Sequence, residues 1–151
     1  MSEFDTDLLA ELVTRRRECL LKLRAMVGKQ LELATGGSVS ALLDILSSKQ
    51  RVIVELQDVE KALSPFRNQD PDQRRWRLPQ ARQRCARQLA ECETLMGQIM
   101  LEEKKSELEM VRRRDETARQ LQGAHQAGRA RGAYAAQPQS AARQIDLSSD
   151  L

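Results

Sequence analysis

Few side chains in this sequence of 151 residues have the types and spacing that catalysis or metal binding requires. The one histidine, His125, has no carboxylate or cysteine near it in the sequence, so we expect a solvated side chain rather than a base or a metal ligand. Cys85 and Cys92 would share one helix face, but zinc sites use closer pairs and four ligands. Together with Cys19 they make three cysteines, an odd number without secretory context, which predicts reduced cytosolic thiols. Cys85 and Cys92 are expected to lie in the core of the protein.

The remaining candidates for enzyme chemistry are equally weak. Glu102 and Glu103 are expected to lie on a helix surface exposed to water, and Gly36-Gly37 follows no strand that could present a phosphate-binding loop. The sequence therefore predicts no catalytic, cofactor-binding or metal-binding residue, and a protein that is not an enzyme.

One basic stretch could bind nucleic acid. It contains these residues: Arg74, Arg75, Trp76, Arg77, Arg82, Arg84 and Arg87. Arginines beside an aromatic ring can hold phosphates and stack on a base. The sequence has no broader basic face and no helix-turn-helix or zinc-finger pattern, which favours a solvated loop with Trp76 packed over the end of a helical bundle. A third interpretation places the loop against an acidic protein surface.

The composition indicates the elements that must position any site. Ala, Glu, Lys, Leu and Arg make up about half of the chain, and only four residues are aromatic. This composition is typical of long helices and unlike that of a sandwich, barrel or doubly wound sheet. No apolar run is long enough to cross a membrane, and the acidic, polar N-terminus does not have the pattern of a signal peptide.

Apolar residues at alternating steps of three and four predict an all-α fold with helices at about residues 6–34, 38–63 and 80–122. Gly36-Gly37 is expected to end the first helix in a left-handed conformation, Ser38 or Ser40 to cap the second, and Pro65 to stop it. The short connection predicts an antiparallel hairpin. Asp70-Pro71-Asp72 could form one helical turn before the third helix.

The third helix has a regular stripe from Cys85 to Ile99, which is expected to pack into the hairpin, and the pattern then weakens. If the steps of three and four are continued beyond Ile99, the next positions of the stripe are the polar residues Glu103 and Ser106. The helix either drifts across the bundle surface, or runs past the hairpin and offers its later apolar residues to a partner. Gly97 is a possible kink. Residues 1–122 are expected to form one helical domain, and the Gly-, Ala- and Gln-rich residues 123–151 a flexible tail.

Three features of this chain resemble the FlgN family of flagellar type III export chaperones. One is the first helix ending at Gly36-Gly37, followed by Ser38-Val39-Ser40-Ala41-Leu42-Leu43 and Lys49. Another is the long third helix with its fading stripe. The third lies in the tail, where Ala133-Tyr134-Ala135 precedes Ala142-Arg143-Gln144-Ile145-Asp146.

The resemblance implies a cytoplasmic, non-enzymatic chaperone without a cofactor. Such a protein binds hook-filament junction proteins, prevents their premature assembly and brings them to the cytoplasmic domain of the export gate. The expected client-binding residues lie on the third helix: Met100, Leu101, Leu108, Met110, Val111, Ala118 and Leu121. Tyr134 is the expected contact with the gate.

Two other functions remain open from the sequence. The same apolar stripe could make the chain a helical scaffold protein that oligomerises. Less favoured is a helical nucleic-acid-binding protein that uses the loop Arg74–Arg77. None of the three functions requires insertion into a membrane.

Overall fold

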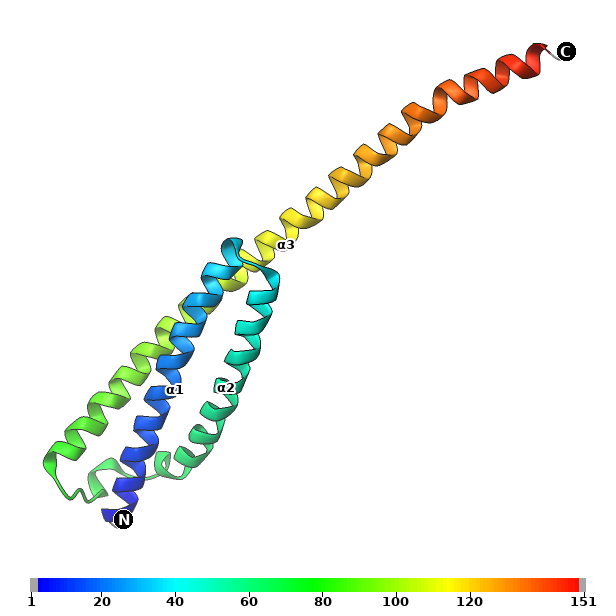
Figure 1. Ribbon diagram of the computed structural model, residues 1–151. Coiled ribbons are helices and arrows are strands. Elements are labelled where there is room, and N and C mark those ends of the chain that lie inside the picture. The colour runs from blue at the N-terminus through cyan, green and yellow to red at the C-terminus, as the bar shows by residue number, and fades with distance from the viewer. Residues whose placement is uncertain (1–2, 150–151) are drawn as a thin grey trace. The chain divides into compact units, whose positions relative to one another are not determined.

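The computed structural model describes residues 3–149, with side-chain exposure described for residues 5–134. All regular structure in this part of the chain is helical, which confirms the all-α prediction. The elements are α1 (Glu3–Gly36), α2 (Val39–Arg67), the short 3₁₀ helix η1 (Pro71–Gln73) and α3 (Pro79–Ser149), drawn in Figure 1. The chain forms two compact units, Met1–Met110 and Val111–Leu151, and each is described by itself.

The turn between α1 and α2 is short and closely packed. Ser38 caps α2, since its hydroxyl accepts a hydrogen bond from the Ala41 amide at 3.1 Å. The amide of Gly37 donates to the Leu33 carbonyl at 2.8 Å. The predicted left-handed glycine is wrong, because no glycine in the described residues has a positive φ. Glycine is needed at 37 because a Cβ there would lie 2.8 Å from the Leu33 Cα.

Helix α2 does not stop at Pro65, contrary to the prediction, but continues through it to Arg67. The extra residues bring Phe66 into the core, where its side chain is 8% exposed. Burial of that ring offsets the backbone hydrogen bond that proline cannot donate. The predicted helical turn at Asp70 is confirmed as η1, which Asp70 caps through its side chain.

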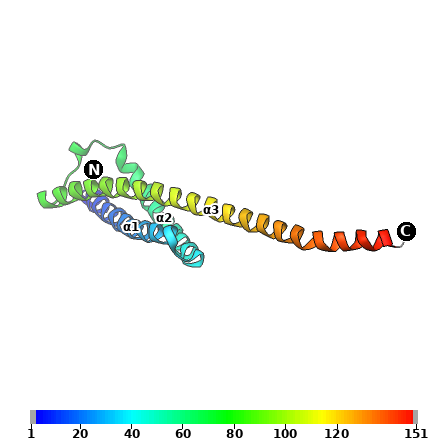
Figure 2. The same cartoon turned by 90° about the horizontal axis from the view of Figure 1, so that it is seen from above.

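The first unit is a bundle of α1, α2 and residues 79–110 of α3, and Figure 2 shows the three from above. Its apolar core falls into two clusters. Near the start of α1, the core residues are Leu9, Leu12, Val13, Val59, Leu63, Phe66 and Cys85. Further along, they are Cys19, Leu20, Leu23, Val27, Val52, Cys92, Leu95 and Ile99. All three thiols are buried, as predicted for the helical pair.

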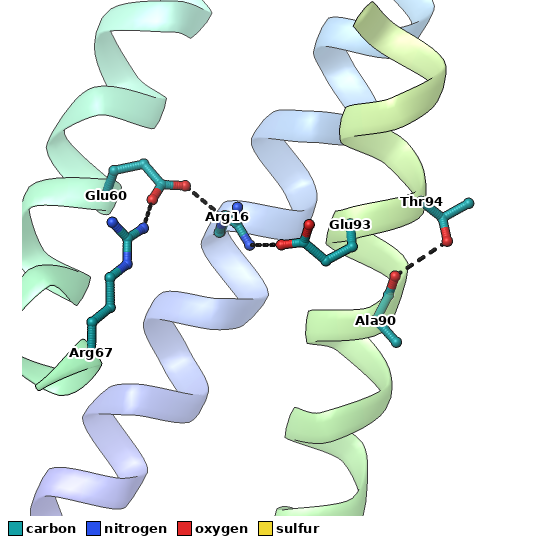
Figure 3. Close-up of polar contacts among 6 residues, drawn as sticks. All are labelled: Arg16, Glu60, Arg67, Ala90, Glu93 and Thr94. Carbon is teal, nitrogen blue, oxygen red and sulfur yellow. Dashed lines mark hydrogen bonds and ion pairs between the residues drawn. The ribbon is translucent and has the colours of Figure 1, made fainter. Parts of the chain in front are cut away.

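An ionic layer around Arg16 lies between these clusters in the sequence. Arg16 Nε lies 2.5 Å from Glu60 Oε1 of α2, and Arg16 Nη1 lies 3.9 Å from Glu93 Oε1 of α3 (Figure 3). Arg67 pairs with the second oxygen of Glu60. The Arg16 side chain is 12% exposed. The apolar stripe of α1 is interrupted at Arg16 because ion pairs there connect α1 to both α2 and α3.

Helix α3 is longer than the predicted segment 80–122. It is continuous through Gly97 and Gly123 and extends to Ser149. An exposed glycine lowers helix stability by only about 1 kcal/mol, so single glycines among alanines, glutamines and arginines do not end it. In the second unit the described side chains are almost all exposed. A helix without packing is marginal in water, and the flexibility expected for residues 123–151 stays a prediction.

Candidate functional site

The part of α3 that follows Ile99 is held to the hairpin by polar side chains. Gln30 Nε2 donates to Ser106 Oγ at 2.8 Å, and Lys49 Nζ donates to Gln30 Oε1 at 2.8 Å. Lys49 also forms an ion pair with Glu103. Gln30 and Ser106 are fully buried, and the Lys49 side chain is 13% exposed. We call this group of four residues the Lys49 layer.

The Lys49 layer explains why the apolar stripe fades. The core-facing positions of α3 continue as predicted through Glu103 and Ser106, but polar side chains occupy them. The expectation that Glu103 lies on a water-exposed surface is therefore wrong, since its carboxylate faces Lys49. Glu102 is also half-buried, with one carboxylate oxygen enclosed next to Gly28 of α1.

The predicted client-binding residues within the first unit lie on the outside of the bundle. Met100 is 67% exposed, Leu101 58% and Leu108 61%. Met110 is half-buried. Leu101 and Leu108 are seven residues apart and so share one helix face. The bundle thus leaves two leucines and a methionine of α3 without an apolar neighbour to cover them.

The remaining predicted contact residues belong to the second unit. Val111, Ala118 and Leu121 are all exposed, Leu121 to 68%. Tyr134, the predicted gate contact, is 82% exposed. The motif at residues 142–146 lies outside the residues whose side chains are described. Every predicted contact residue except Met110 is therefore accessible to a partner in the unit to which it belongs.

The groups that could do chemistry are not assembled for it. Burial raises the pKa of the Cys19, Cys85 and Cys92 thiols above their ordinary value, which keeps them protonated and unreactive. His125 is exposed. No cluster of three or more histidine, cysteine, aspartate or glutamate side chains that could hold a metal ion occurs in the described residues.

The arginines of the 74–77 loop contact the protein itself. Arg74 donates to the Phe66 carbonyl at 2.8 Å, and Arg77 lies 3.3 Å from a carboxylate oxygen of Asp7. Trp76 packs against the apolar cluster at that end of the bundle. This arrangement matches the predicted packing of Trp76 over the bundle end, and two of the three arginines in residues 74–77 contact other parts of the bundle.

Two features escaped the sequence reasoning. One is the Lys49 layer, whose signal was present because Lys49 and Glu103 interrupt otherwise apolar stripes. The other is a line of three hollows between α1 and α3, of about 480, 450 and 390 Å³. Leu21 and Arg24 belong to two of them. A groove between packed helices leaves no periodic mark in a sequence, because its lining is drawn from the edges of two stripes.

We compared the chain with known protein families, curated proteins and solved structures. The chain matches no protein family model, no curated protein and no solved structure. In the described part of the chain, no helix combines the length and the apolar character that crossing a bilayer requires.

Proposed function

We propose that this protein is a cytoplasmic flagellar type III export chaperone that binds hook-filament junction proteins, keeps them unassembled and delivers them to the export gate. The proposal is supported above all by the exposure of Met100, Leu101 and Leu108 on a helix whose opposite side closes the bundle. The sequence resemblance to the FlgN family supplies the class of client.

The proposed mechanism is the packing of a client helix on α3. Clients of this class would end in amphipathic helices, and such a helix can cover exposed leucines as it would cover those of its own assembly partner. Burying a leucine completely contributes about 1.5–3 kcal/mol. Leu101 and Leu108 are roughly 60% exposed, so each would contribute about 1–2 kcal/mol. Met100 has a flexible side chain that adapts to more than one client surface.

The experiment measures binding of a purified hook-filament junction protein by the full chain. Leu101→Asp and Leu108→Asp should each weaken binding by roughly tenfold or more. Leu43→Asp is the matched control, because Leu43 is also about 60% exposed but lies on α2. Equal losses in all three variants would refute the site, and absence of any binding by the unaltered chain would refute the function.

Delivery to the gate is assigned to Tyr134. An exposed aromatic side chain in a solvated segment can anchor a short docking contact. Tyr134→Ala should reduce binding to the cytoplasmic domain of the gate without changing client affinity. A simultaneous loss of both would contradict separate sites.

The exposed leucines also suit a scaffold that oligomerises through α3. Light scattering with and without the client separates the two functions. A chaperone should be a smaller species once the client covers α3, whereas a scaffold should keep its oligomeric mass.

A further inference from the structure

The line of hollows between α1 and α3 precedes the leucines proposed for the client: Thr94 of the central hollow lies seven residues before Leu101, on the same face of α3. The central hollow, of about 480 Å³, is lined by Leu21, Arg24, Arg87, Ala90, Glu91, Thr94, Leu95 and Gln98. The other two follow it along the same pair of helices. Small residues (Ala25, Gly28, Ala90 and Thr94) lie along the first two hollows, and we call the three together the α1/α3 groove.

The central hollow has an apolar base. Leu21 is 39% exposed there, and Leu95 lies beneath it in the core. The Thr94 hydroxyl donates to the Ala90 carbonyl at 3.2 Å (Figure 3), so it is already satisfied within α3, and Gln98 adds to the lining one buried amide oxygen without a hydrogen-bond partner in the described residues. An amphipathic helix could therefore place an apolar face on this base.

The charges at the rim of the central hollow are positive. Arg24 on α1 and Arg87 on α3 form no ion pair within the described residues, while Glu91 is held by Arg17. The flanking hollows differ, since one contains Glu11 with Arg15 and the other Glu102 with Arg24. Of the three, only the central hollow has unpaired charges of one sign.

We propose that the α1/α3 groove docks an amphipathic helix of a partner protein whose carboxylates pair with Arg24 and Arg87. Arginine suits this role because its planar guanidinium binds a carboxylate through two hydrogen bonds. Two such pairs at the rim fix the position of the partner helix, and the apolar base provides its contact area. This docking uses a part of α3 that precedes the leucines proposed for the client.

The test uses two synthetic helical peptides of about 18 residues, roughly five turns. Both have the same leucine and alanine face, and they differ only in glutamate or lysine at the flanking positions. Binding to the full chain is followed by fluorescence anisotropy. The glutamate peptide should bind at least about tenfold more tightly, and its affinity should fall as salt is added.

The double variant Arg24→Glu/Arg87→Glu should reverse this preference in favour of the lysine peptide. Both arginines are exposed, and each variant is compared with the unaltered chain by circular dichroism to verify folding. The matched control is Arg51→Glu/Lys61→Glu, which changes the net charge equally on α2, away from the hollows. Because the chain has a net charge of +3, this control separates the groove from general attraction. Equal losses in both double variants would overturn the proposal.

Two further variants locate the peptide. Ala90→Trp fills the central hollow and should abolish binding of the glutamate peptide, whereas Leu108→Asp should not change it. The opposite result would place the peptide on the leucine surface and overturn the groove. If light scattering shows that the unaltered chain is a dimer and Ala90→Trp makes it a monomer, a second copy occupies the groove and the partner helix is refuted.

Discussion

Replacing the charges of the Lys49 layer tests how α3 is held. Glu103→Leu leaves the Lys49 ammonium, only 13% exposed, with Gln30 Oε1 as its one remaining described partner. Stranding a fully buried charge costs about 3–5 kcal/mol, and the partial exposure reduces this to about 2 kcal/mol. Lys49→Met should cost about the same, about 2 kcal/mol: the Glu103 side chain is 35% exposed and can turn towards water, but the buried Gln30 Oε1 loses its donor.

The double variant Lys49→Met/Glu103→Leu removes both charges and leaves Gln30 Oε1 without its donor, so it should cost about 1–2 kcal/mol. The single effects sum to about 4 kcal/mol, so the coupling between the two positions should be about 2–3 kcal/mol. Urea unfolding followed by circular dichroism gives the free energies. Glu32→Ala, which breaks the exposed pair with Lys29, is the control and should cost less than about 0.5 kcal/mol. A coupling below about 0.5 kcal/mol would refute the role of this layer.

The other predictions concern two glycines and three thiols. Gly37→Val should lower stability by about 2 kcal/mol, because the new Cβ meets the backbone of α1 at 2.8 Å, and a fall in the unfolding midpoint measures this. Gly97→Ala should raise stability by about 0.5–1 kcal/mol, since a Cβ there meets nothing within 4 Å; a decrease would reveal a contact. Cys19, Cys85 and Cys92 should resist alkylation until the chain unfolds. Because burial raises the pKa of the folded thiols, the thiols of the unfolded chain ionise at lower pH. The free energy of unfolding should therefore fall as the pH rises above about 9. In a variant with all three cysteines replaced by alanine, this fall should be smaller.

Most of the fold follows from the spacing of apolar residues. The two arms of the hairpin, the cap at Ser38 and the turn at Asp70 depend on local patterns, and local patterns can be read directly. The C-terminal end of α2 could not be predicted from local sequence patterns. Pro65 is a local stop signal, and burial of Phe66 against residues distant in the sequence outweighs it.

The candidate site was predictable only in part. Exposure of Leu101 and Leu108 follows from the helical positions, because they lie opposite the stripe that ends at Ile99. The charged rim of the α1/α3 groove was not predictable, because it depends on which side chains of two separate helices meet. Arg17 pairs with Glu91 at the rim of the central hollow, and this pairing leaves Arg24 and Arg87 as the charges of that rim without an ion pair in the described residues.

The Lys49 layer connects these observations. A helix that docks through apolar side chains alone could rotate and bury whichever leucines lie closest to the hairpin. An ion pair and a buried hydrogen bond are satisfied in only one rotation, so Glu103 and Ser106 fix which side of α3 faces inwards. Leu101 and Leu108 are then held outwards, because turning them inwards would strand the Lys49 charge. The same polar residues that weaken the sequence pattern thus keep the leucine surface available to a partner.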